Sequence, residues 1–294
     1  MMVEPIHAPP QKALSMRWMM LPAVGFVLAM IVFPFLYAGW LALNDFVFGS
    51  SMRFTGAGNF ARLAHDPEFV NALALTFILY AVSLAMQLVL GTWLALVLNR
   101  VERLKGLVRT VAISPFMLPP VVVGMMAIVI FDPSFGIANW VLAQAGFGPR
   151  LWLSDPEWAI LTVAVIDTWQ WTPFVALIVL GGLQALPQRV FEAAEVDGAV
   201  GWRRFLYITL PLLGPTLLTA AVLRSVDLLR FFDIIYITTR GGPGIATQTV
   251  NIFAYRRGFE FLDIGYASAA MIVLSLTVLV TVLAFARLRR ALAW

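Results

Sequence analysis

Polar side chains interrupt two long apolar stretches of this sequence, and their types suit the binding of a hydroxyl-rich solute. The earlier stretch contains an aspartate, a glutamine and two tryptophans, namely Asp167, Trp169, Gln170 and Trp171. The later stretch alternates arginine and aspartate at three-residue spacing, namely Arg224, Asp227, Arg230 and Asp233. Charged groups and amides hydrogen-bond hydroxyls, and aromatic faces cover the apolar side of a sugar ring. Together these residues predict an internal site for a sugar or polyol.

The charge spacing in residues 224–233 also allows a structural interpretation. Residues three apart are neighbours on a helix, so the ladder can neutralise itself, and buried ion pairs can be purely structural. Both interpretations stay open. The arginines would suit an anionic sugar derivative or a sugar phosphate, but Asp227 and Asp233 counter their charge, which favours a neutral solute. Three aromatic residues beside the ladder either line the same path or pack in the bundle: Phe231, Phe232 and Tyr236.

A second polar interruption, EAAEVDGAVGWRRFLYITLP, occupies residues 192–211. Its first six residues are mostly good helix formers with acids at the front, where the helix dipole favours negative charge. Gly198 permits a sharp turn, after which a second short helix continues into the next apolar stretch. The pattern predicts two short helices joined at a glycine. Composition alone does not distinguish an amphipathic helix on the membrane surface from a segment that docks on another protein.

The composition places these segments in a membrane protein. Of the 294 residues, 61% are hydrophobic and 12% are charged, whereas a soluble domain is roughly 45–50% apolar and about 25% charged. Six stretches are long enough to span a bilayer. They cover about residues 18–43, 72–98, 108–131, 158–184, 211–237 and 264–286. The sequence therefore predicts an all-α integral membrane protein with a single domain over 18–290 and the helix-turn-helix segment, about 188–210, between its fourth and fifth spans.

The positive-inside rule orients these spans. With a cytoplasmic N-terminus, twelve lysines and arginines fall on the inside and six on the outside. Both the tail of residues 1–17 and the end of residues 291–294 are then cytoplasmic, as is the segment at 188–210. The first apolar run is too long for the core of a cleavable signal peptide. The net charge of +4 is explained by these inside loops, and no nucleic-acid partner is expected.

Several function classes are disfavoured by what the sequence lacks. It has no cysteine and only two histidines, so neither a thiolate metal site nor an imidazole cluster is expected. It also lacks H-E-x-x-H and G-x-S-x-G, which argues against a membrane enzyme. A secondary transporter would share the polar residues near the midplane but would need no docking segment. A purely structural scaffold would leave the charges within the spans unexplained.

Resemblance to a known family distinguishes the remaining alternatives. Glu192-Ala193-Ala194, then Gly198 after three residues, then Ile208-x-Leu210-Pro211 after nine, resembles the cytoplasmic signature of permease subunits of bacterial ABC importers. Four further stretches resemble the carbohydrate-importing branch of this family, and the similarity extends over about residues 18–290. The stretches are ISPFMLPPVVVG, SFGIANWVL, WQWTPFVALIVLGGLQALP and FFDIIYITTRGGPG. The last is similar to the MalF-like member of an unequal permease pair, although Arg240 departs from the frequent T-G-G-G-P.

The resemblance implies a multi-pass subunit of the bacterial cytoplasmic membrane that moves solute by alternating access. Its partners would be a second, MalG-like permease, two copies of an ATPase subunit, a solute-binding protein outside and membrane lipid. ATP and Mg would bind to the ATPase subunits, and this chain would bind no cofactor and no metal; it contains no G-x-x-x-x-G-K-[ST] phosphate loop. The resemblance implies a coupling helix docked on the ATPase, with the following contact, packing and turn residues: Glu192, Ala193, Ala194, Asp197 and Gly198.

Overall fold

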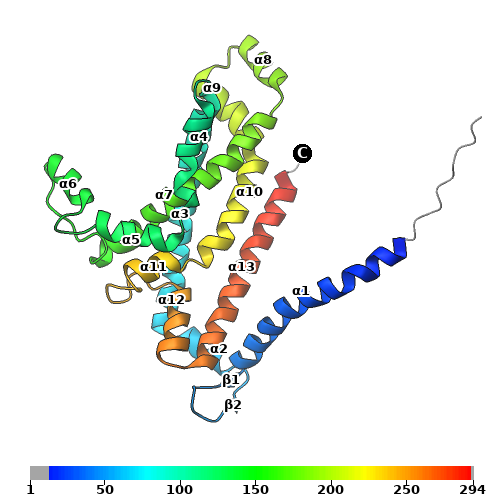
Figure 1. The fold of residues 1–294 in the computed structure, drawn as a ribbon, viewed down its shortest axis with the longest axis vertical. Coiled ribbons are helices and arrows are strands. Elements are labelled where there is room, and N and C mark those ends of the chain that lie inside the picture. Colours follow the sequence, from blue (N-terminus) through cyan, green and yellow to red (C-terminus); the bar gives the residue numbers. More distant parts are fainter. Residues whose placement is uncertain (1–12, 293–294) are drawn as a thin grey trace, which may run out of the picture.

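The computed structural model describes residues 13–292, so most of the two predicted terminal segments lies outside the described residues. Five helices among these residues are long and apolar enough to cross a membrane. Along the chain these are α1 (Ala13–Ala42), α3 (Pro67–Arg100), α7 (Pro156–Ala185), the segment Gly201–Thr238 that contains α10 (Leu210–Leu229), and α13 (Ile264–Leu292). Figure 1 shows α3, α7, α10 and α13 as one bundle, while α1 diverges from it. The predicted all-helical membrane fold is confirmed.

Shorter elements connect these helices at the two ends of the bundle. One end, called the α8 end here, carries α4 (Lys105–Ile113), α8 (Gln188–Val196) and α9 (Gly201–Arg204), followed by the π-helical turn η2 (Phe205–Thr209). The opposite end, called the β1 end, carries α2 (Gly58–His65) and the pair β1 (Asn44–Asp45) and β2 (Arg53–Phe54), which is antiparallel. Along one side lie α5 (Pro120–Ile130), α6 (Ile137–Gln144), α11 (Asp233–Thr238), α12 (Val250–Tyr255) and the turn η3 (Arg256–Glu260).

Helix α1 contacts the bundle through its C-terminal part and leaves most of its length exposed. Leu41 and Ala42 are buried against the bundle, whereas the side chains from Met20 to Leu36 are exposed. Figure 1 shows α1 running away from α13 towards its N-terminus. Because these exposed side chains are almost all apolar, they have to be covered by lipid or by another membrane subunit.

Small residues allow the long helices to approach closely. A Cβ atom at Gly91 of α3 would lie 2.6 Å from Val175 Cγ1 on α7, and one at Gly182 of α7 would lie 2.6 Å from Thr216 Oγ1 on α10. Around these contacts lies a core that includes Ala95 and Ala176. Helices in a membrane gain little from hydrophobic burial against each other, so close packing of this kind supplies much of their association energy.

The predicted span over residues 108–131 is not one continuous helix. Helix α4 and the 3₁₀ turn η1 (Ser114–Met117) meet α5 at an angle of 92°. Leu118 and Pro119 adopt extended conformations between them. Pro119 and Pro120 lack a backbone donor, and each disfavours helical geometry in the residue before it. The proline pair therefore breaks this span rather than merely bending it.

The predicted span over residues 211–237 lies within one candidate membrane span, Gly201–Thr238, but its helix is interrupted, which corrects the single charge ladder inferred from spacing. Helix α10 ends at Leu229, residues 230–232 are not helical, and α11 starts at Asp233. Arg224 and Asp227 remain helical neighbours, with 3.6 Å between Nη1 and Oδ2, and Arg230 Nη2 lies 4.0 Å from Asp227 Oδ1. Asp233 lies beyond the break and has no ion pair among the described residues.

A hydrogen-bonded cluster holds the β1 end together. Asp66 caps α3 by accepting from the Glu68 amide (2.9 Å), and it also accepts from the Tyr266 hydroxyl of α13 (2.7 Å). Burial would raise the pKa of Asp66, but the Tyr266 and backbone hydrogen bonds and the nearby Arg257 lower it below its ordinary value of 3.8. A carboxylate with a lowered pKa stabilises the fold above its ordinary pKa, and this contribution is lost as the pH falls through the folded-state value.

Two adjacent glycines of α7 provide a matched test of the packing. Gly182→Ala places a methyl group against the stiff Thr216 side chain, and we expect a loss of about 1–3 kcal/mol from overpacking. Gly181→Ala meets nothing within 4 Å, so it is expected to be neutral or to stabilise by up to about 1 kcal/mol through helix propensity. Thermal denaturation of the purified protein measures both. Equal effects of the two changes would contradict close packing at Gly182.

Candidate functional site

A cavity of about 420 Å³ lies where the two interrupted spans meet α7, α12 and α13. Its lining combines charged, amide and aromatic side chains with a few apolar ones. The lining residues are Pro120, Asp167, Gln170, Trp171, Arg224, Asp227, Arg230, Phe231, Phe232, Asp233, Ile234, Asn251 and Met271. They come from six helices and from the non-helical residues after α10. We call it the midplane pocket, because Asp167, Gln170 and Trp171 lie near the middle of α7, and it is the first candidate site.

A closed triangle of hydrogen bonds forms the buried wall of the midplane pocket. Arg224 Nε of α10 donates to Gln87 Oε1 of α3 (2.8 Å), and its Nη2 donates to Asp167 Oδ2 of α7 (3.1 Å). Gln87 Nε2 closes the triangle by donating to Asp167 Oδ2 (2.6 Å). All three side chains are at most 1% exposed. The triangle therefore connects three long helices at one depth and satisfies a charge pair that would otherwise be costly to bury.

Arg224 also faces the open part of the pocket. Its guanidinium carbon lies 4.1 Å from the centre of the Trp171 ring, a cation–π arrangement. Asp227, which is exposed, places its Oδ2 3.6 Å from Arg224 Nη1. Two arginines and three aspartates line the pocket. The formal charges of these five side chains sum to −1.

Gln170 connects the pocket to the break in the third predicted span. Its Nε2 donates to the carbonyl of Leu118 (2.8 Å), a backbone acceptor released by the break before Pro119. In a membrane such a freed backbone group has to find a partner within the protein. Gln170 Oε1 is buried and has no partner among the described residues, so it remains available to accept a hydrogen bond.

A row of four aromatic rings extends from the midplane pocket. Phe232 stacks on Tyr236, with ring centres 5.1 Å apart, and Tyr255 contacts both rings and Phe259. Phe232, Tyr255 and Phe259 line a second cavity of about 540 Å³, which shares Phe232, Asn251 and Met271 with the midplane pocket. The two cavities are therefore adjacent and differ in character, one being charged and the other aromatic and apolar.

Most of the solute-path residues predicted from sequence come together around the midplane pocket. Seven of the nine line it: Asp167, Gln170, Trp171, Asp227, Arg230, Phe231 and Asp233. Trp169 does not line the pocket and is half exposed. Tyr236 contacts the pocket only through its stacking on Phe232.

Sequence reasoning missed Gln87 and Asn251, which shape this site, and it missed the main partner of Arg224. Gln87 was not considered because a single glutamine in an apolar run has no spacing partner. Arg224 was assigned only to the ladder, although its shortest ion pair joins it to another helix, at Asp167. Asn251, which donates to the Arg230 carbonyl, lies outside every predicted span. No pattern in the sequence indicates these contacts between helices.

The second candidate site is the turn between α8 and α9. Gly198 has a φ of +73°. The Gly198 amide donates to the Glu195 carbonyl (3.1 Å), and the Ala199 amide donates to the Ala194 carbonyl (2.8 Å). This pair of bonds around a left-handed glycine is the Schellman motif, which ends helices. Gly198 therefore forms the turn that its position predicted.

The surface of this turn carries acids and apolar side chains. Glu192, Ala193 and Asp197 are exposed, whereas Ala194 is buried within the chain. Arg204 Nη1 of α9 donates to Glu195 Oε1 of α8 (2.6 Å), which connects the two helices. Val196 is 88% exposed.

Comparison with known proteins identifies the class to which this arrangement belongs. Residues 87–293 match the family described as the binding-protein-dependent transport system inner membrane component, and the chain belongs to this family of ABC importer permeases. Among its relatives, the trehalose/maltose transport system permease protein MalF of Thermococcus litoralis is 38% identical, over 92% of this chain and 93% of the relative. The sn-glycerol-3-phosphate transport system permease protein UgpA of Agrobacterium fabrum is 35% identical, over 83% of each chain.

A solved structure has the same fold. A chain of a bacterial alginate ABC transporter, crystallised with an alginate-bound periplasmic protein, superimposes with a TM-score of 0.83 over 96% of both chains at 24% identity. The family assignment made from the Glu192 to Pro211 signature is thus confirmed. The chain is a multi-pass inner-membrane permease without an ATPase domain, binds no cofactor, and relies on a partner subunit to hydrolyse ATP.

The buried triangle yields a stability prediction. Arg224→Gln leaves Asp167 unpaired, and we expect the free energy of unfolding to fall by about 3–5 kcal/mol. Arg224→Gln combined with Asp167→Asn should lose less than the sum of the two single changes, because no unpaired charge remains. Arg230→Gln, an exposed arginine at the end of the same helix, is the matched control and should cost less than about 1 kcal/mol. Thermal denaturation of the purified importer measures the series, and additive effects would contradict the coupling.

Proposed function

We propose that this chain is one of two permease subunits of an ABC importer that carries a neutral sugar or polyol into the cytoplasm. The observation that carries the proposal is the midplane pocket with its adjacent row of aromatic rings. Amide, carboxylate and guanidinium groups there can hydrogen-bond hydroxyls, while Phe232 and Trp171 offer aromatic faces to the apolar side of a sugar ring. The trehalose/maltose relative supports this class of solute.

The alternative is an anionic sugar derivative or a sugar phosphate, which the glycerol-3-phosphate relative makes a specific candidate. Arg224 and Arg230 would be its binding groups. However, Arg224 is already paired with Asp167 and lies near Asp227, and Arg230 lies near Asp227 as well. An anion would add to a pocket that already carries net negative charge. A neutral solute avoids this repulsion and is therefore preferred.

The proposed orientation places the α8 end in the cytoplasm, together with both termini. The second permease, of the MalG type, would cover one part of the exposed apolar surface of α1, and lipid would cover the rest. Each of two ATPase subunits would meet one permease, and here the contact would be the turn between α8 and α9. Glu192 and Asp197 are exposed at this turn and form no ion pair among the described residues, which leaves their charges available to a partner. The solute-binding protein would dock at the β1 end.

A continuous helical connection supports alternating access as the mechanism. From Gly201, residues continue through α9, η2 and α10 to Leu229 without a break, and Arg224 lies on this rod. Movement of the docked turn would therefore be transmitted to the wall of the midplane pocket. Rocking of the helices between two arrangements would open the pocket to one side of the membrane at a time.

Uptake by the reconstituted importer with its binding protein tests the solute class. We expect ATP-dependent uptake of neutral disaccharides or polyols, and no uptake of sugar phosphates. Arg230→Ala should lower uptake about tenfold or more, since a lost hydrogen bond to a charged group costs about 1.5–3 kcal/mol. Arg103→Ala removes an exposed arginine in the loop after α3, outside the pocket lining and away from the β1 end, and should leave uptake unchanged. Uptake of sugar phosphates alone would reverse the assignment, and uptake without the ATPase would favour a secondary transporter.

Solute-stimulated ATPase activity tests the docking role of the turn. Glu192→Arg reverses the charge of a side chain that is proposed to contact the ATPase. Gly198→Pro removes the left-handed conformation of the turn, since proline requires a negative φ. We expect both variants to bind the loaded binding protein but to lose stimulation of ATP hydrolysis. Glu102→Arg is a matched control, an exposed acid in the other loop at the α8 end, and should behave as wild type. Wild-type stimulation in both test variants would exclude docking through this turn.

A further inference from the structure

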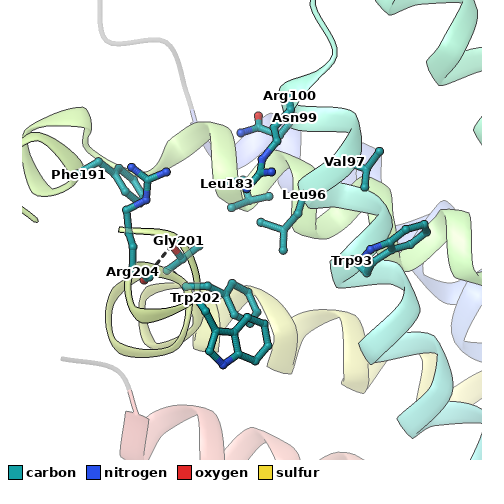
Figure 2. A pocket seen from close by; sticks show the side chains of 12 residues that line it. Trp93, Leu96, Val97, Asn99, Arg100, Leu183, Phe191, Gly201, Trp202 and Arg204 are labelled. Carbon is teal, nitrogen blue, oxygen red and sulfur yellow. Dashed lines mark hydrogen bonds between the residues drawn. The ribbon is translucent and has the colours of Figure 1, made fainter. Parts of the chain in front are cut away.

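A third cavity, of about 540 Å³, lies at the α8 end and is separate from the midplane pocket. It lies between the last two turns of α3, the C-terminal part of α7, and the segment from α8 to η2. Figure 2 shows Arg100 extending from the end of α3 toward Leu183, Arg204 of α9 beside Phe191, and Trp93 and Trp202 on different helices. We call it the α8-end pocket.

The α8-end pocket is polar at one end and apolar at the other. Asn99 and Arg100 lie at the end of α3, while Trp93 and Val97 belong to the part of α3 nearer the bundle centre. With a helical rise of 1.5 Å per residue, Trp93 and Arg100 are separated by about 10 Å along the axis. Leu96 and Leu183 continue the apolar part. A soluble anion would contact only the polar end. The change from polar to apolar side chains along the pocket therefore indicates an amphiphilic ligand.

The charge of the pocket selects an anionic amphiphile. Two arginines and no acidic residue belong to its lining among the residues that the structure describes. Arg100 has no ion pair within the described part of the chain, and Arg204 uses Nη1 for Glu195, which leaves its other guanidinium donors for a ligand. Planar guanidinium groups bind phosphate oxygens through paired hydrogen bonds. A basic pocket between helices at the cytoplasmic side is the usual environment of acidic lipid headgroups.

The pocket is also open at its side. Trp93 is 62% exposed and Trp202 is 71% exposed. Tryptophan is enriched at the level of lipid headgroups, where its ring is apolar and its N–H can hydrogen-bond. Two exposed tryptophans beside two arginines therefore place this opening at the membrane–water interface rather than in the aqueous phase.

We propose that the α8-end pocket binds an acidic phospholipid of the cytoplasmic leaflet, with its phosphate between Arg100 and Arg204 and its acyl chain along Trp93, Val97 and Leu183. The site rests on the proposed orientation of the chain but not on the identity of the transported solute. A lipid bound there contacts both α3 and the helix that follows the Gly198 turn. It would thereby stabilise one position of the docking segment relative to the bundle.

Native mass spectrometry of the intact, purified importer complex tests this site by counting retained lipids. Phosphatidylglycerol and phosphatidylcholine with the same acyl chains are added separately. We expect the complex to retain phosphatidylglycerol in preference, and Arg100→Gln to reduce that retention about fivefold or more. Arg103→Gln, which removes an equal charge three residues further along but outside the pocket lining, should retain phosphatidylglycerol as wild type does.

A second pair of variants tests the apolar end. Trp93→Ala should also reduce retention, whereas Trp40→Ala, an exposed tryptophan at the β1 end of α1, should not. Equal retention of the two lipids, or equal losses in Arg100→Gln and Arg103→Gln, would overturn the proposal. The proposal would also be overturned if the wild-type complex retained no lipid and Arg100→Gln instead weakened the association of the protein subunits. That result would indicate a protein segment as the occupant. The lipid count is independent of transport, so failure of this site is distinguishable from failure of the proposed import function.

Discussion

A single guanidinium group, buried where three membrane helices meet, constrains the rest of this permease. An unpaired charge at that depth would be severely destabilising, so α3 and α7 have to present Gln87 and Asp167 to Arg224 at one level. This requirement determines the rotation and the relative height of three helices. Glycine contacts at Gly91 and Gly182 let the same helices approach closely enough for the hydrogen bonds to form.

The pocket exists because two helices end beside this triangle. Ending a helix within a membrane releases backbone carbonyls, and those groups need partners from the protein. Gln170 bonds the Leu118 carbonyl, and Asn251 bonds the Arg230 carbonyl. The side chains that stabilise the breaks thus also line the cavity or lie at its edge. Structural and solute-binding roles of polar residues overlap here, so removing one side chain affects both, and matched controls are needed to separate them.

Local features of the sequence were predicted well, and contacts between helices were not. Apolar run lengths located the helices, and the position of Gly198 after a run of helix formers predicted a turn that has the expected left-handed conformation. The three-residue spacing from Arg224 to Asp233 suggested one continuous helix, but the chain breaks after Leu229. Spacing along a chain cannot reveal that Arg224 pairs with Asp167, because the pair depends on how two helices are rotated about their axes. For the same reason Trp169 was grouped with Trp171, although only Trp171 faces the cavity.

The unbroken helix from Gly201 to Leu229 also has a geometric consequence. At 1.5 Å per residue it is about 40 Å long, comparable with the thickness of a whole bilayer. If such a rod pivots about one end, a rotation of about 10° displaces the other end by about 7 Å, more than one helical turn. A small change of angle where the rod emerges from the membrane is therefore sufficient to exchange one set of side-chain neighbours around Arg224 for another.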